Sequence, residues 1–500
     1  MLEESVGSDS SGGNAMQSGE RLVDHLFRRA GFGATAADLQ AVAGMSYNAM
    51  VDYFVDYEQQ PDDVDTKIGL PDYVGITTRG QFSPNTSIED ARQRWLFRMV
   101  HTRRPLQEKM ALFWHNLFGV GYSKVAGGVG AVVGTKMMAL KAGELPGPQG
   151  HYELLRQRAL GKFRELLIEV AKDPAMLVFL DGRTNVRARP QENFGREVME
   201  LFTWGIGHYQ ESDVYAAARV FTGWNLRNVP GAMANDPAAY QEFVYNGNQH
   251  ELTAKTFTFP VGTSNTIPAR AAGAGMQDGI DFLTALANHP ETARRLARKL
   301  WAFFVSEVED PNPAFVEAVA DVYLRSDTDM RSVMRFLLKS QWFNNSSYFF
   351  ARYSWPAEFV ARTVKEMGWN GLSIDSARAP LVNMGQTLFE PPNVAGWQLG
   401  RAWFGTSAML ARMNFAASVA ANQKFNLARS FSANERAQPD RVLTAMLKRF
   451  SGAPYAQVEL DEMLTYLNAG GVWTGNDAQM NAKAPGLARL VAGSGEYQFT

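Results

Sequence analysis

Helical periodicity is the feature of this sequence that most limits its fold. After Pro105, which suits the first position of a helix, apolar residues recur at helical spacing and form one wide stripe: Leu106, Met110, Phe113, Trp114 and Leu117. Similar patterns recur from residue 21 to residue 469, whereas short strand-like runs occur within 225–267. The sequence therefore predicts a mainly α protein, a multi-helical globular array with Gly/Pro/Trp-rich loops and at most a small β-hairpin excursion.

The length of 500 residues exceeds what one hydrophobic core usually contains, so we expect subdomains. The expected parts are a disordered N-terminal lead (1–20), a main helical domain (21–422) with irregular insertions at 125–150 and 225–267, a linker (423–439) and a small C-terminal helical region (440–500). The lead is acidic and rich in Ser and Gly, and it lacks the basic start and apolar centre of a signal peptide. We therefore expect a soluble chain without a signal peptide.

Composition excludes several classes of function. The chain has 49 basic and 51 acidic side chains, a net charge of −2, so no global attraction to nucleic acid is expected. It has no cysteine, which excludes disulfides, thiolate metal sites and cysteine nucleophiles. No run approaches the roughly 20 apolar residues of a transmembrane segment. The usual serine-hydrolase, zinc-protease and nucleotide-binding motifs are also absent from the sequence.

The most informative run for function is ENFGREVMELFTWGIG, from Glu192 to Gly207. Read as a helix, it places an apolar stripe (Phe194, Val198, Leu201 and Phe202) opposite a polar face (Arg196, Glu197, Glu200 and Thr203). Two interpretations of the polar face remain open. It is either an acid/base or metal site, or an ion-pair ladder in which Arg196 meets Glu200 or another carboxylate and another arginine, for example Arg219, meets Glu197.

A catalytic role for Glu197 and Glu200 needs further groups, because neighbours on one helix point the same way. Without a metal, a third carboxylate such as Asp213 or Glu251 would have to lie across the cleft. With a divalent metal such as zinc, iron or manganese, the candidate ligands are His115, His208, His250 and Glu251. No two of these histidines have short ligand spacing, and a lone histidine is usually a core or helix-end residue.

Three tryptophans are candidate ligand contacts: Trp224, Trp397 and Trp403. Together with Arg196 they form the predicted binding set, in which the indole rings stack on a sugar or another flat ligand. The alternative is a buried plug that closes helix ends, with each indole N–H bonded to a partner. The plug is the favoured interpretation.

Several blocks of the chain resemble one bacterial family. RRAGFGAT (Arg28 to Thr35), RPLQEKMALFWHNLF (Arg104 to Phe118), the stretch 173–224 and MGQTLFEPPNVAGW (Met384 to Trp397) are similar to motifs of the domain of unknown function 1800 family. The resemblance covers roughly 21–420. It implies little about chemistry, because the family is largely uncharacterised. Its members are often exported and encoded beside sulfatase-like proteins, so it implies export and a sulfatase-like partner.

This chain departs from the family pattern at two places. The second histidine of the family's FWHNHF motif is Leu117 here, and a later His-Asp pair is His250-Glu251. Two hypotheses for function remain. One is metal-assisted hydrolysis of an extracellular carbohydrate or ester in a polar cleft on the Glu197/Glu200 helix. The other is a non-catalytic scaffold or binding protein that acts with the exported partner.

Overall fold

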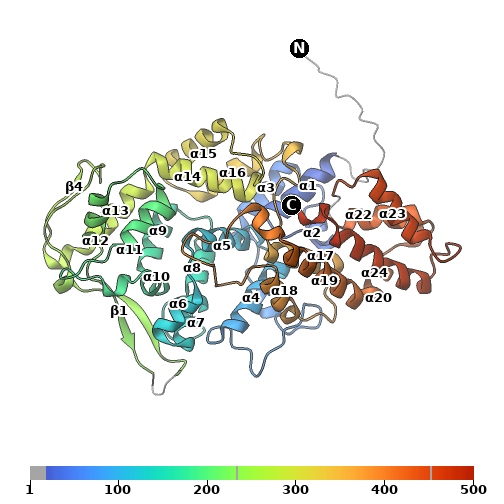
Figure 1. Cartoon of the computed structure of the whole chain (residues 1–500), viewed down its shortest axis with the longest axis horizontal. Coiled ribbons are helices and arrows are strands. Elements are labelled where there is room, and N and C mark those ends of the chain that lie inside the picture. Colours follow the sequence, from blue (N-terminus) through green and yellow to red (C-terminus); the bar gives the residue numbers. More distant parts are fainter. Residues whose placement is uncertain (1–17, 232–234, 451–452) are drawn as a thin grey trace, which may run out of the picture.

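The computed structural model describes residues 18–231, 235–450 and 453–500. Within these residues the chain forms 24 α-helices and two small two-stranded sheets, so the predicted mainly α fold is confirmed. The molecule is elongated, with the α11–α13 region at one end, α22–α24 at the other, and α1 near the α22–α24 end (Figure 1). No helix of the described residues is long and apolar enough to cross a membrane.

The helices fall into three consecutive groups along the chain. The first group is α1 (Ser18–Arg29), α2 (Ala36–Ala41), α3 (Tyr47–Val55), α4 (Ile88–His101), α5 (Pro105–Phe118), α6 (Tyr122–Val129), α7 (Ala131–Ala139) and α8 (His151–Gln157). The second is α9 (Phe163–Lys172), α10 (Pro174–Phe179), α11 (Asn193–Glu197), α12 (Glu211–Val220), α13 (Met276–Ala287), α14 (Pro290–Leu300), α15 (Pro313–Arg325) and α16 (Met330–Lys339). The third is α17 (Pro356–Met367), α18 (Arg378–Asn383), α19 (Thr406–Asn422), α20 (Lys424–Arg429), α21 (Ala433–Arg436), α22 (Pro439–Arg449), α23 (Gln457–Asn468) and α24 (Asp477–Gly493).

Two of these helices continue as π-helix, which widens the turn. The segment η4 (Val198–Thr203) extends α11, and η7 (Trp301–Val305) extends α14. Both pack against α5: Phe202 lies 5.3 Å from Phe118 between ring centroids, and Phe303 lies 5.3 Å from Phe113.

Helix α5 is the centre of the core. The predicted apolar stripe after Pro105 is buried, but the opposite side of the helix is buried as well and includes Glu108 and His115. A helix that is buried on all sides must have other elements packed around it. Here α4, α8, η4 and η7 pack against α5. Helix α17 is similarly buried along its whole length.

The backbone of the last residues returns to this centre. Thr500 N donates to Arg352 O at 2.8 Å, and Arg362 of α17 donates to Phe499 O at 3.0 Å. Tyr497, Gln498 and Thr500 are buried. Residues 497–500 are therefore part of the core around α17.

The strands lie within the stretch that was predicted to be irregular with a hairpin. β1 (Trp224–Val229) pairs antiparallel with β2 (Tyr240–Tyr245), with Trp224 opposite Tyr245. β3 (Lys255–Thr256) pairs antiparallel with β4 (Thr266–Ile267). The first hairpin projects from the lower edge of the molecule in Figure 1.

The prediction of an irregular insertion at 125–150 is wrong for its first half, which belongs to α6 and α7. Glycine has a packing role here. Gly130 has φ 90° at the turn between the two helices, and a Cβ on Gly134 would lie 2.8 Å from Ala126 Cα. The glycines therefore allow a tight turn and a close contact between the helices. Residues 140–150 do lack regular structure.

The linker predicted at 423–439 contains the short helices α20 and α21. In α21, Ser432 and Glu435 form a reciprocal capping box, with Ser432 N donating to Glu435 at 2.7 Å. The capping box stabilises the start of this polar helix. The helix has no apolar stripe, so hydrophobic periodicity does not predict it. Both α19 and α20 pack on α24. Of the predicted N-terminal lead, residues 1–17 lie outside the described residues, and 18–20 begin α1.

Candidate functional site

The helix that carries Glu197 and Glu200 buries its predicted apolar residues Phe194, Val198 and Phe202. Thr203 was predicted on the polar face but is fully buried, where its hydroxyl donates to Val198 O at 2.6 Å. The π-helical turn explains the difference, because its wider winding rotates the residues that follow away from the positions expected for an α-helix.

Arg196 forms ion pairs with carboxylates other than Glu200. It contacts Glu211 at 2.6 Å and Glu192 at 3.3 Å, and its own side chain is 34% exposed. Arg219 was expected near Glu197, yet it lies 3.9 Å from Glu251 and donates to Ala254 O at 3.0 Å. Arg196 therefore pairs with another carboxylate in place of Glu200, which the prediction allowed, whereas the predicted Arg219–Glu197 pair is wrong.

The two glutamates are partly buried neighbours. The Tyr209 hydroxyl donates to Glu200 Oε2 at 2.6 Å. Burial, together with the negative charge of Glu200, raises the pKa of Glu197. Arg295 of α14 approaches the same helix and donates to Leu201 O at 3.3 Å.

Asp213, the predicted third carboxylate, is buried and has a structural role. It accepts hydrogen bonds from Thr258 N at 2.7 Å and from the Thr258 hydroxyl at 2.6 Å. It also accepts from Gln210 N at 2.8 Å, which completes a capping box at the start of α12. Its oxygens thus hold α12 to the segment after β3.

The predicted metal ligands occupy separate environments. His115 is buried in α5, whereas His208 is exposed in the turn after η4. The ring nitrogens of His250 face Thr222 O at 2.7 Å and Asp278 at 3.0 Å, and Glu251 accepts from Thr253 N at 3.0 Å. In the part of the chain that the structure describes, no three or more His, Asp or Glu side chains are arranged to hold a metal ion.

The three candidate tryptophans are all buried in the core. Trp224 is 1% exposed, and Trp397 and Trp403 are each 4% exposed. Trp397 and Trp403 pack beside Trp355, with ring centroids 6.4 and 5.8 Å away. Among the described residues the indole nitrogens of Trp224 and Trp403 have no hydrogen-bond partner. These rings fill space between elements and present no open face on which a ligand stacks.

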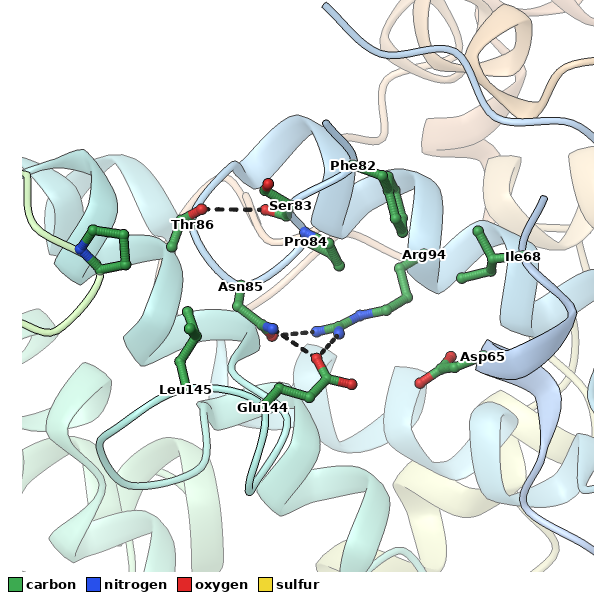
Figure 2. Close-up of a pocket in the computed structure, with 11 residues that line it drawn as sticks. Asp65, Ile68, Phe82, Ser83, Pro84, Asn85, Thr86, Arg94, Glu144 and Leu145 are labelled. Carbon is green, nitrogen blue, oxygen red and sulfur yellow. Dashed lines mark hydrogen bonds and ion pairs between the residues drawn. The ribbon is translucent and has the colours of Figure 1, made fainter. Parts of the chain in front are cut away.

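A polar pocket of about 480 Å³ lies elsewhere, between the start of α4 and the loop after α7 (Figure 2). We call it the polar pocket, and it is lined by Asp65, Ile68, Phe82, Ser83, Pro84, Asn85, Thr86, Arg94, Glu144, Leu145 and Pro237. Its volume falls within the roughly 300–1,000 Å³ of small-molecule sites.

The wall of the polar pocket is one connected network. Glu144 Oε2 accepts from Asn85 at 2.6 Å and from Arg94 at 3.1 Å, and Asn85 Oδ1 accepts from Arg94 at 3.2 Å. In Figure 2 the carboxylates of Glu144 and Asp65 reach toward each other below Arg94. Lys141 lies 2.7 Å from Asp65 and 3.9 Å from Glu144 and so connects the two acids.

Asp65 is held ionised by its neighbours. Arg98 of α4 contacts both carboxylate oxygens, at 2.7 and 2.6 Å. Burial alone would raise the pKa of Asp65, but the hydrogen bonds and charges of Arg98 and Lys141 hold it well below its usual range. Asp65 is therefore an acceptor and carries no proton to give at neutral pH.

The polar pocket was not predicted from the sequence. Its residues come from four segments that are far apart in the chain. The available signal was Arg94 and Arg98, two cations one turn apart within the otherwise apolar end of α4. Buried arginines require acidic partners, and Asp65, Glu144 and Glu153 supply them.

A larger groove of about 1,120 Å³ lies between α1, α2 and α22. Its lining includes apolar side chains such as Val42, Met50 and Phe431, and Lys448 on its edge pairs with Glu20 at 2.8 Å. The lining of this groove does not indicate which chemical class of ligand would bind. The hydrogen-bonding groups of the polar pocket do indicate a chemical class.

Comparison with known proteins gives one match. A family model described as "Protein of unknown function (DUF1800)" matches residues 25–499, nearly the whole chain. No curated protein and no solved structure matches the chain. The chain belongs to the DUF1800 family of proteins of unknown function.

Proposed function

We propose that this protein binds a neutral, polyhydroxylated ligand of the carbohydrate class in the polar pocket, without catalysing a reaction there. The observation that supports this proposal is the charge balance of the pocket lining and of the side chains paired with it. Asp65, Glu144 and Arg94 line the pocket, and they form ion pairs with one another or with Arg98, Lys141 and Glu153, so that three acids meet three cations. A charged ligand would leave an uncompensated charge in this partly buried place, so an uncharged ligand is favoured.

The pocket offers groups that suit sugar hydroxyls. Among the described residues, Glu144 Oε1 has only Lys141 near it, at 3.9 Å, and so remains able to accept a hydrogen bond. Ser83 and Thr86 line the same space; their hydroxyls donate to Gln81 O at 3.2 Å and to Ser83 O at 3.5 Å, which leaves each hydroxyl oxygen as an acceptor. The half-buried Phe82 ring provides an apolar surface for the C–H face of a sugar ring.

The same charges argue against hydrolysis in this pocket. A glycosidase needs one carboxylic acid that donates a proton near neutral pH. Asp65 is ionised far below that range, and Arg94 and Asn85 already hydrogen-bond Glu144. The arrangement therefore suits binding.

The test is calorimetric titration of the full chain with neutral sugars (glucose, galactose, mannose, xylose, N-acetylglucosamine, cellobiose and lactose), with glucuronate as the charged control. We expect at least one neutral sugar to bind, and glucuronate to bind at least about tenfold more weakly than glucose, a difference of roughly 1.4 kcal/mol. Absence of binding by every neutral sugar at millimolar concentration would refute the proposal.

Substitutions of pocket residues test whether the sugar binds in the polar pocket. Phe82→Ala and Glu144→Gln should each weaken sugar binding about tenfold or more while the melting temperature changes little. Gln81→Ala is the matched control, because Gln81 is exposed beside Phe82 but does not line the pocket. If Gln81→Ala weakened binding as much as Phe82→Ala, the pocket would not be the site.

A second candidate function, hydrolysis of a carbohydrate or ester at the Glu197/Glu200 helix, is favoured by one observation. The raised pKa of Glu197 moves it toward the range of a general acid. Glu197→Gln should then abolish hydrolysis of nitrophenyl glycosides or nitrophenyl acetate, and Glu192→Gln should not. Equal rates for the wild type and Glu197→Gln would exclude this role.

The sulfatase-like partner implied by the family resemblance stays part of this proposal as a prediction. A binding protein for an extracellular sugar would bring that sugar to an enzyme that acts on it. Co-purification of the full chain with a candidate sulfatase-like protein tests the association, and separate elution at micromolar concentration would exclude it.

A further inference from the structure

Four polar atoms meet in the buried space between α4, α5 and α8 and lack hydrogen-bond partners among the described residues. They are both ring nitrogens of His115, Nε2 of His151 and Nε1 of Trp95. All three side chains are completely buried. An unsatisfied buried polar atom costs about 1–3 kcal/mol, so several of them together indicate that a further atom or ion belongs there.

His151 is oriented as a metal-binding histidine is. Its Nδ1 lies 2.6 Å from Asp173 Oδ2, and Asp173 is 4% exposed. The carboxylate accepts from Nδ1, and Nε2 is the ring nitrogen that has no hydrogen-bond partner among the described residues. A carboxylate behind a histidine in this way fixes the ring and strengthens it as a ligand.

His115 lies next to the His151 ring. The two ring centroids are 6.0 Å apart, with 60° between the ring planes. With metal–nitrogen bonds of about 2.0–2.1 Å, one ion can bond a nitrogen of each ring at this separation. Three aromatic rings also lie near His115: Trp95, Phe389 and Trp397, with centroids 5.3, 5.9 and 5.5 Å away.

We propose that His115 and His151 together bind one monovalent copper ion, Cu(I). Two imidazoles suffice for Cu(I), which is stable with two nitrogen ligands, whereas zinc, iron and manganese take four or more. The charge balance also favours a monovalent ion, because the single negative charge of Asp173, behind His151, balances a single positive charge. The nearby Glu108 is already neutralised by Arg156. A divalent ion would leave an uncompensated charge among aromatic rings.

The site is separate from the polar pocket, and the inference does not rest on the proposed function. It replaces the predicted set around His115: His208, His250 and Glu251 are elsewhere, and the second ligand is His151. Two ligands also agree with the finding that no group of three or more metal-binding side chains occurs in the described residues.

The test is direct measurement of copper in the untagged full chain. The protein is loaded anaerobically with Cu(I), desalted, and analysed for copper, zinc, iron and manganese. We expect about one copper per folded chain, and X-ray absorption should show Cu(I) with two nitrogen neighbours. A folded wild-type chain that takes up no copper overturns the proposal, since the histidines are then bridged by water only. Preferential binding of zinc overturns it as well.

Variants identify the ligands. His115→Gln and His151→Gln should each reduce copper to below about a tenth per chain. His25→Gln is the matched control, because His25 is equally buried but packs between Phe343 and Phe349. It should retain copper, and its loss of copper would overturn the assignment.

Asp173→Asn leaves both ligands in place, so it tests the site even if a histidine variant does not fold. It should weaken Cu(I) affinity about 10–100-fold in competition with bicinchoninate. An unchanged affinity in a folded Asp173→Asn variant would remove the support that the carboxylate gives to the proposal.

Discussion

Lys109 of α5 and Glu358 of α17 form an ion pair in the centre of the molecule, with 0% and 2% of the two side chains exposed. Lys109 Nζ also donates to Gly31 O at 2.8 Å, and Arg352 contacts Glu358 Oε2 at 2.7 Å. The pair therefore joins two largely buried helices, α5 and α17, to each other and to the turn after α1.

Removal of one partner of this pair should destabilise the protein strongly. Lys109→Met leaves Glu358 with one cation fewer in the core, and breaking a buried pair costs about 3–5 kcal/mol. Urea unfolding of the two proteins measures the difference. Lys124→Met is the control: the Lys124–Asp181 pair is half exposed, so its loss should cost less than about 1 kcal/mol. Similar losses in both variants would contradict the central role of Lys109.

Acid should weaken the same contact. Burial alone would raise the pKa of Glu358, but the charges of Arg352 and Lys109 lower it from 4.5 to about 2. The stabilisation is therefore complete above pH 4.5, where the unfolded chain is also ionised. It is lost as pH falls toward 2, because the unfolded chain then binds a proton that the folded chain does not.

This acid-sensitive part amounts to roughly 3 kcal/mol. Unfolding free energies of the wild type and Glu358→Gln at pH 7, 4.5 and 3 test it. The difference between the two proteins should shrink below pH 4.5, and a constant difference across this range would contradict the expectation.

Arg196→Ala should have little effect on stability. Arg196 does pair with acids, but its side chain and that of Glu192 are each 34% exposed, and that of Glu211 is 60% exposed. Exposed pairs contribute about 0–1 kcal/mol and weaken with salt. Thermal melting at low and high ionic strength measures this contribution. A loss of more than about 2 kcal/mol would show that Arg196 supports the π-helical turn in another way.

Two glycines of neighbouring helices should respond in opposite ways to alanine. Gly134→Ala places a Cβ 2.8 Å from Ala126 Cα and should cost about 1–3 kcal/mol. Gly127→Ala meets nothing within 4 Å in α6 and should stabilise the protein by about 0.5–1 kcal/mol. Thermal melting checks this: the melting temperature of Gly134→Ala should lie below that of the wild type, and that of Gly127→Ala should lie above it. If both variants were neutral, the close contact of α6 and α7 would not be rigid.

Features that depend on local spacing were predicted best. The stripe after Pro105 and a small hairpin within 225–267 both follow from neighbours in sequence, and both are present. Thr203 was misplaced because a π-turn changes the residue period, which an α-helical pattern does not anticipate. Helix α21 was missed because its four residues are polar or small and form no apolar stripe.

The sites depended on contacts between distant segments, and those were not predictable from spacing. Asp65, Arg94 and Glu144 meet in one wall although 79 residues separate the first from the last. His115 finds His151 across two helices, with a carboxylate from Asp173 behind it. The sequence contained all of these residues, but no periodicity links them, and only the packing of α4, α5, α7 and α8 brings them together.

The return of residues 497–500 to the core affects how the chain is made. Arg352 and Arg362 bond to the backbone of residues 497–500, which is synthesised more than 130 residues after Arg362. At about 5–20 residues per second, these bonds can form only roughly 7–30 seconds after the arginines have been made. The centre of the protein therefore closes only after residues 497–500 have been made. During that interval its apolar helices are exposed to chaperones and proteases.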